Sequence, residues 1–167
     1  MGLLDDRTVV ITGAGRGLGE AYARAAAAEG ATVVVNDVEG DLADAVARDI
    51  VAGGGRAVAH PADVSDWAAA EGLIARCVEE FGRIDALVNN AGEFALALPQ
   101  EQGAEDARRL LDVNVYGTIA CGTAALRRMV EQGSGVVLNV TSGEQMGNTA
   151  TGVYGATKAA VATLTYS

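Results

Sequence analysis

The chain has few of the residues that usually form metal sites or disulfides. Its 167 residues include two cysteines and one histidine. Cys77 and Cys121 lie in helical patterns without a C-x-x-C pair or neighbouring histidines, so we expect buried thiols rather than a disulfide or a metal site. His60 stands apart from the other candidate residues and is interpreted as structural. With two prolines and no low-complexity linker, the sequence predicts one domain over residues 1–167.

Aromatic residues and positive charge are also scarce. Aromatics make up 4% of the chain, so a core built from Val, Ala, Leu and Ile is expected, and the net charge is −10. Such a charge repels phosphate backbones and anionic lipid, which argues against nucleic acid or a membrane surface as a partner. Neither a secretory leader nor a membrane-spanning apolar run is visible. These features predict a soluble, cytoplasmic protein.

Short apolar runs alternate with longer helical patterns along the whole sequence. Strand patterns cover 7–12, 32–36, 56–60, 85–89 and 135–141, and helix patterns cover 17–29, 41–52, 66–81, 104–132 and the residues from 152 onward, with Ser65 as the expected cap of the third helix. This alternation predicts an α/β fold, a Rossmann-like doubly wound parallel sheet with strand order 3-2-1-4-5. Ligands bind such sheets at the carboxyl ends of the strands.

A glycine-rich turn follows the first predicted strand. The sequence TGAGRGLG, residues 12–19, places glycines at Gly13, Gly17 and Gly19. This G-x-x-x-G-x-G spacing differs from the G-x-G-x-x-G dinucleotide fingerprint. Glycines still permit a tight turn, and the N-terminus of the following helix offers free N–H groups to a pyrophosphate. The position between a strand and a helix favours phosphate binding over a purely structural turn.

The second predicted strand ends at an acidic residue, Asp37. A carboxylate there can accept hydrogen bonds from the adenosine ribose and would repel a 2′-phosphate, which favours NAD over NADP. Arg16 argues in the opposite direction, because a guanidinium can receive that phosphate. The structural alternative for Asp37 is a turn or helix-capping aspartate.

Tyr154 and Lys158, the only lysine of the chain, stand four residues apart in the last predicted helix. Residues at this spacing share a helix face and can interact. A phenol has an unperturbed pKa of about 10, so it transfers protons poorly at neutral pH unless a positive charge nearby favours the phenolate. Lys158 would supply that charge.

Taken together, the motifs resemble the short-chain dehydrogenases/reductases, in their compact single-domain branch. The matching segments are 12–19, Asp63-Val64, Asn89-Asn90-Ala91-Gly92, Asn114, Ser142, and Tyr154 with Lys158. The resemblance covers essentially the whole chain, and it implies NAD-dependent hydride transfer to or from an alcohol or carbonyl substrate. It also implies a homodimer or homotetramer.

The resemblance implies a role for each site residue. Tyr154 would be the general acid/base, Lys158 would assist it and bind the nicotinamide ribose, Ser142 would orient the carbonyl, and Asn114 would hold a water behind Lys158. The cofactor would be bound by Gly13, Gly15, Arg16, Gly17, Leu18, Gly19, Asp37, Asp63, Val64, Asn90, Ala91 and Gly92, together with Tyr154 and Lys158.

Several alternatives stay open at this point. Thr141, not Ser142, has the separation from Tyr154 that is usual in the family. Asp63 could serve only a turn, and Asn89-Asn90 could serve only loop backbone. Glu93, Phe94, Gln145 and Met146 are candidates for a mixed apolar substrate pocket.

The end of the sequence departs from the family pattern. Full-length relatives continue well beyond Ser167, so we expect the domain to be incomplete at its C-terminus, with the last strands missing. A non-catalytic NAD-binding regulatory or interaction protein is therefore the alternative function.

Overall fold

A five-stranded parallel sheet forms the centre of the computed structural model, which describes residues 2–166. The strands are β1 (Thr8–Ile11), β2 (Thr32–Val35), β3 (Arg56–Ala59), β4 (Ala86–Asn89) and β5 (Val136–Asn139). Their order is β3-β2-β1-β4-β5, and every pair is parallel. The predicted Rossmann-like fold and its strand order are confirmed.

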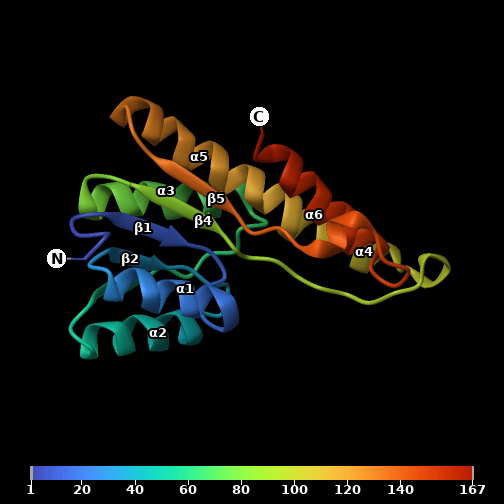
Figure 1. Cartoon of the computed structure of the whole chain (residues 1–167), viewed down its shortest axis with the longest axis horizontal. Coiled ribbons are helices and arrows are strands. Elements are labelled where there is room, and N and C mark those ends of the chain that lie inside the picture. Colours follow the sequence, from blue (N-terminus) through green and yellow to red (C-terminus); the bar gives the residue numbers. More distant parts are fainter. Residues whose placement is uncertain (1, 167) are drawn as a thin grey trace.

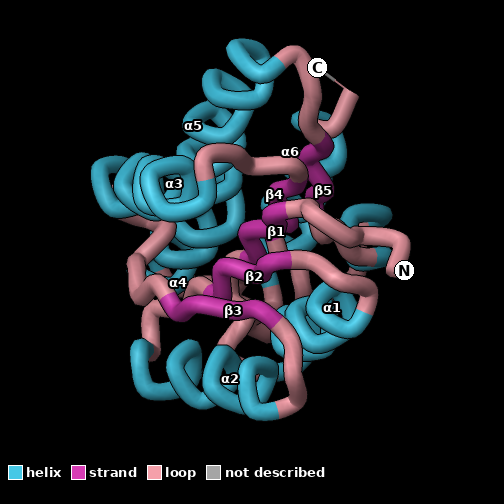
Figure 2. Tube along the Cα trace, turned by 90° about the vertical axis from the view of Figure 1, so that its left-hand side faces the viewer, coloured by secondary structure: helices cyan, strands magenta, loops and turns pink. Residues whose placement is uncertain are grey.

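Helices cover both faces of this sheet (Figure 1). The helices of the described residues are α1 (Gly17–Ala28), α2 (Gly40–Ala52), α3 (Trp67–Phe81), α4 (Ala104–Leu111), α5 (Gly117–Gln132) and α6 (Gly152–Leu164). Helices α1 and α2 lie on one face, and α3 and α5 on the other (Figure 2). Right-handed crossovers between parallel strands produce this arrangement.

The core follows the two-residue period of the strands. In β1, Val9 and Ile11 pack under α1 and α2, while Val10 packs under α3 and α5. All three are at least 96% buried, as expected for a sheet covered on both sides. At the edge strand β5, however, Val136 and Leu138 are 55% and 54% exposed.

The prediction of one helix over 104–132 is wrong in one respect, because the helical stretch has these bounds but is not α-helical throughout. Helices α4 and α5 are separated by a π-helical turn, Asp112–Tyr116, in which the N–H of Gly117 bonds the carbonyl of Asp112. The hydroxyl of Thr118 donates to the carbonyl of Asn114 at 2.7 Å. Single π turns are frequent at functional sites, and this one carries a predicted site residue, Asn114.

The predicted capping of α3 by Ser65 is also wrong. Asp66 is the N-cap, and its carboxylate accepts from the N–H groups of Ala68 and Ala69 at 2.8 and 3.1 Å. Ser65 instead donates its N–H and hydroxyl to Asp63. An ionised carboxylate accepts hydrogen bonds more strongly than a hydroxyl, so the aspartate takes the cap.

Over residues 2–166, no helix is both long and apolar enough to cross a lipid bilayer.

Candidate functional site

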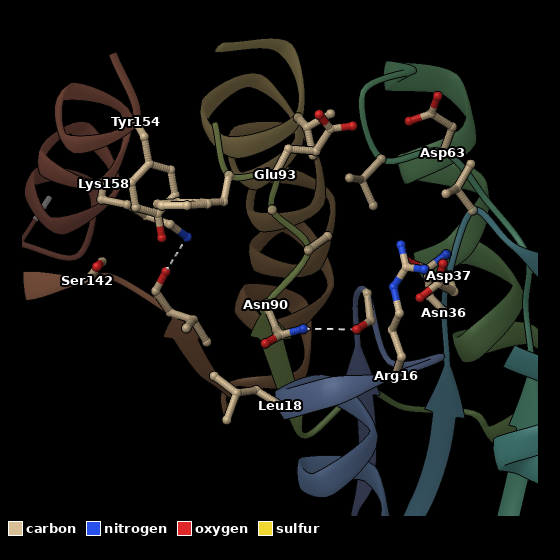
Figure 3. Close-up of a pocket in the computed structure, with 18 of the residues that line it drawn as sticks. Arg16, Leu18, Asn36, Asp37, Asp63, Asn90, Glu93, Ser142, Tyr154 and Lys158 are labelled. Carbon is tan, nitrogen blue, oxygen red and sulfur yellow. Dashed lines mark hydrogen bonds between the residues drawn. The ribbon is translucent and has the colours of Figure 1, made fainter. Parts of the chain in front are cut away.

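A cavity of about 570 Å³ opens at the carboxyl ends of the strands. Its volume lies in the usual range for cofactor and substrate sites. Most of the predicted site residues line it: Gly13, Arg16, Leu18, Asp37, Asp63, Val64, Asn90, Ala91, Gly92, Ser142, Tyr154 and Lys158. Figure 3 shows Ser142, Tyr154 and Lys158 at one end and Asp37 and Asp63 at the other. The strand order thus brings together residues that are far apart in the sequence.

Four predicted site residues, Gly15, Gly17, Gly19 and Asn114, are not among the described residues that line the cavity. Gly17 begins α1 with φ at +60°, a conformation that favours glycine. Gly19 packs directly on the backbone of Gly13, so closely that a Cβ would overlap its carbonyl oxygen. Gly19 is thus buried under the turn, whereas Gly17 is exposed and a Cβ there would meet no atom within 4 Å.

Thr12 and Asn90 tie the glycine turn to the end of β4. The hydroxyl oxygen of Thr12 accepts from the N–H groups of Asn90 and Ala91 at 3.1 and 3.0 Å. The side-chain amide of Asn90 donates to the carbonyl of Thr12 at 2.9 Å and to that of Gly13 at 3.0 Å, the second of which is drawn in Figure 3. The role of Thr12 was missed in the sequence, although its place directly after a strand could have indicated it.

Asp37 binds the glycine turn through its carboxylate. It accepts from the N–H of Gly15 at 2.9 Å and from the N–H of Glu39 at 3.0 Å. The turn role considered for this aspartate is therefore present in the structure. Arg16 forms an exposed ion pair with Glu39 at 3.0 Å, which compensates its charge.

Asn36 leaves a polar atom without a partner beside this end of the cavity. Its side-chain amide N–H groups donate to the carbonyls of His60 and Ala62, both at 3.0 Å. Its Oδ1 has no hydrogen-bond partner among the described residues, although the side chain is 1% exposed. Because buried acceptors are rarely left unpaired, a ligand with a hydrogen-bond donor fits here. The sequence reasoning had not singled out Asn36.

Tyr154 and Lys158 share one face of α6, as their spacing predicts. The ammonium of Lys158 lies 5.9 Å from the centroid of the Tyr154 ring and donates to the carbonyl of Val140 at 2.9 Å. Lys158 is 5% exposed. Burial lowers the pKa of this ammonium below its ordinary value of 10.5, because the charged form loses hydration.

The depressed pKa of Lys158 predicts a pH-dependent stability. Just below pH 10.5 the unfolded chain holds more protons on this lysine than the folded chain does. The wild type should therefore gain stability relative to Lys158→Met as the pH rises toward that value. Urea unfolding of both proteins at a series of pH values measures the difference in free energy of unfolding. If the difference in free energy of unfolding between the two proteins stayed constant or fell as the pH rose, the lowered pKa of Lys158 would be contradicted.

Asn114 connects the end of β4 to α6. Its side chain accepts from the N–H of Glu93 at 2.7 Å and donates to the carbonyl of Glu93 at 2.9 Å and the hydroxyl of Thr157 at 3.0 Å. Thr157 in turn donates to the carbonyl of Tyr154 at 2.7 Å. Asn114 is thus a buried hub that fixes the segment after Gly92 against the helix of Tyr154.

The Tyr154 end of the cavity is lined by both candidates for the carbonyl-orienting hydroxyl and by two of the four candidates for the substrate pocket. Thr141 and Ser142 both line the cavity, so the choice between them stays a prediction. Glu93 and Phe94 line it as well. Gln145 and Met146 are not among the described residues that line the cavity. The short 3₁₀ turn Gly143–Met146 carries them away after Ser142.

Comparison with known proteins gives one consistent result. The family model for short chain dehydrogenases matches residues 7–167. The chain is 40% identical over 163 residues to a 3-oxoacyl-(acyl-carrier-protein) reductase of Synechocystis, covering 96% of this chain and 66% of the relative. It is 41% identical to a sorbitol dehydrogenase of Cereibacter sphaeroides, covering 98% of this chain and 64% of the relative.

A solved structure agrees with these sequence matches. The crystal structure of a short chain dehydrogenase from Mycobacterium avium superposes with a TM-score of 0.93 at 40% identity, covering 99% of this chain and 62% of that one. The chain thus spans less than two thirds of the length of these relatives. Members of this family use nicotinamide cofactors, either NAD or NADP. On the family match, the sequence identities and the shared fold, this chain belongs to the short-chain dehydrogenase family.

Proposed function

We propose that this chain is an NAD-dependent oxidoreductase that interconverts an alcohol and a carbonyl compound, with Tyr154 as the general acid/base. One observation carries the proposal. Tyr154, Lys158 and Ser142 lie at one end of the same cavity whose other end is formed by Asp37 and the glycine turn. An elongated dinucleotide with its reactive ring beside Tyr154 matches this layout.

The cofactor would be held from end to end by groups that line the cavity. The N-terminus of α1 offers backbone N–H groups, since the side chain of its N-cap residue, Arg16, makes no capping hydrogen bond. A pyrophosphate is stabilised at such a helix end. Asp63 and Val64 border the adenine side, and the free Oδ1 of Asn36 can accept from a donor there.

The charges near Asp37 support NAD over NADP. Arg16 is paired with Glu39, so its positive charge is compensated, while the carboxylate of Asp37 has no cationic partner among the ion pairs of the described residues. A 2′-phosphate would meet net negative charge at this place. We therefore propose a preference for NAD.

The proposed mechanism assigns proton transfer to the protein. When bound, the nicotinamide ring supplies the hydride acceptor or donor. Tyr154 takes the proton from the substrate hydroxyl during oxidation and returns it during reduction. The ammonium of Lys158, 5.9 Å from the Tyr154 ring, favours negative charge on the phenol oxygen. The hydroxyl of Ser142 donates to the substrate oxygen and stabilises its developing charge.

Turnover and binding measured separately on the 167-residue chain test the proposal. We expect a panel of alcohols with NAD⁺, and of ketones with NADH, to give turnover followed at the absorbance of NADH. Fluorescence titration should show that NADH binds more tightly than NADPH. NADPH binding as tightly as NADH would overturn the cofactor preference.

The alternative is a non-catalytic NAD-binding protein. Tight NADH binding without turnover on any substrate of the panel would establish the alternative and reject the enzyme.

A further inference from the structure

Phe94 makes the closest aromatic contact with the proposed acid/base. Its ring packs edge-on against the ring of Tyr154, with centroids 4.8 Å apart and planes at 83°. Both residues line the cavity, and Phe94 keeps 57% of its surface exposed. Edge-on pairs are favoured by ring electrostatics beyond the area that they bury. The contact therefore places an aromatic edge beside the phenol ring within the cavity.

Phe94 can serve as a fixed support because the residue before it is anchored from two sides. The backbone N–H and carbonyl of Glu93 are both bound by the side chain of Asn114, at 2.7 and 2.9 Å. The Glu93 carboxylate forms an ion pair with Arg109 of α4. This anchoring ties the start of the Phe94 segment to α4 and to the π turn.

We propose that Phe94 is a positioning residue for Tyr154, acting through its edge-on contact with the phenol ring. The proposal rests on the proposed function, since it concerns the same proton transfer. Tyr154 is itself only half-buried, so its ring depends on neighbouring side chains for a single orientation. On one side of the ring is the ammonium of Lys158, and the edge-on contact with Phe94 is a second restraint.

Loss of this support should lower kcat without much effect on binding. A displacement of about 1 Å at a reacting group costs up to about 100-fold in rate, and a loosened ring samples such displacements part of the time. For Phe94→Leu we expect kcat to fall by about 10-fold, with the NADH dissociation constant changed by less than about 2-fold. Phe94→Tyr keeps the aromatic edge and should retain at least about half of the wild-type kcat.

A second aromatic pair in the same chain provides the matched control. Trp67 and Tyr116 also pack edge-on, with centroids 5.5 Å apart and planes at 61°, and neither lines the cavity among the described residues. Tyr116→Leu removes a comparable pair and should leave kcat within about 2-fold of wild type. Equal losses in Tyr116→Leu and Phe94→Leu, or an unchanged kcat in Phe94→Leu, would overturn the proposal.

Fluorine NMR gives a readout that does not depend on turnover. Tyrosines labelled with 3-fluorotyrosine give separate resonances, and Tyr154→Phe identifies that of Tyr154. Phe94→Leu should broaden or split this resonance, because the single orientation of the ring is lost, whereas Phe94→Tyr, which adds one labelled ring, should leave the Tyr154 resonance a single sharp line. A single sharp line in Phe94→Leu, even one moved by the lost ring current, overturns the proposal. Absence of turnover in the wild type would reject the proposed function but not the role of Phe94. The fluorine resonance of Tyr154 would still show whether Phe94 orients its ring.

Discussion

Tyr154→Phe is expected to lower kcat by about 10²–10⁴-fold, the usual contribution of a positioned general acid/base. The substitution removes a single oxygen and leaves the ring, so the edge-on contact with Phe94 at 4.8 Å remains. The ammonium of Lys158 also keeps its bond to the carbonyl of Val140. NADH affinity should therefore change far less than kcat does. Steady-state kinetics and NADH fluorescence titration measure the two quantities.

Tyr166→Phe is the matched control, because Tyr166 follows α6 and is 90% exposed. It should behave like the wild type in both assays. A Tyr154→Phe variant that keeps kcat within about 10-fold of wild type would remove this residue from the acid/base role. A large loss of NADH affinity in the same variant would assign the phenol hydroxyl to cofactor binding instead.

The sheet could be predicted because local patterns determine it almost alone. Runs such as Val33-Val34-Val35, separated by helical segments, leave parallel pairing as the arrangement that buries both faces. Right-handed crossovers then restrict the strand order to very few possibilities. The placement of site residues at the carboxyl ends of the strands follows from the same topology, which is why Asp37, Asn90 and Ser142 line one cavity.

Features that depend on contacts between distant residues could not be predicted. The π turn is accompanied by hydrogen bonds from Asn114 to Glu93 and to Thr157, which lie 21 and 43 positions away. The helix propensities of the residues in the turn do not indicate such distant partners. One partner of Asp37 is of the same kind, since the N–H of Gly15 lies 22 positions from it. Sequence patterns indicated that Asp37 lies at the site, but not that its carboxylate also braces the glycine turn.

Gly19→Ala is expected to disrupt the glycine turn. A Cβ at this position would overlap the carbonyl oxygen of Gly13 and lie 2.6 Å from Nδ2 of Asn90 and 2.8 Å from Cα of Ala14. Two of these three atoms belong to the backbone, so the turn itself must move. We expect the free energy of unfolding to fall by about 1–3 kcal/mol, measured by urea unfolding. NADH binding should weaken by roughly tenfold or more, about 1.4 kcal/mol, because the N-terminus of α1 moves with the turn.

Gly72→Ala separates this steric effect from the general effect of replacing glycine in a helix. Gly72 lies inside α3, and a Cβ there would meet no atom within 4 Å. Since alanine loses less backbone entropy than glycine on folding, Gly72→Ala should raise the free energy of unfolding by about 0.5–1 kcal/mol and leave NADH binding unchanged. If Gly19→Ala were as stable as Gly72→Ala and bound NADH like the wild type, close packing of Gly19 on Gly13 could not be what shapes the turn. If the free energy of unfolding fell in Gly19→Ala and rose in Gly72→Ala, and only Gly19→Ala lost NADH affinity, the packing of Gly19 on Gly13 would be what shapes the turn.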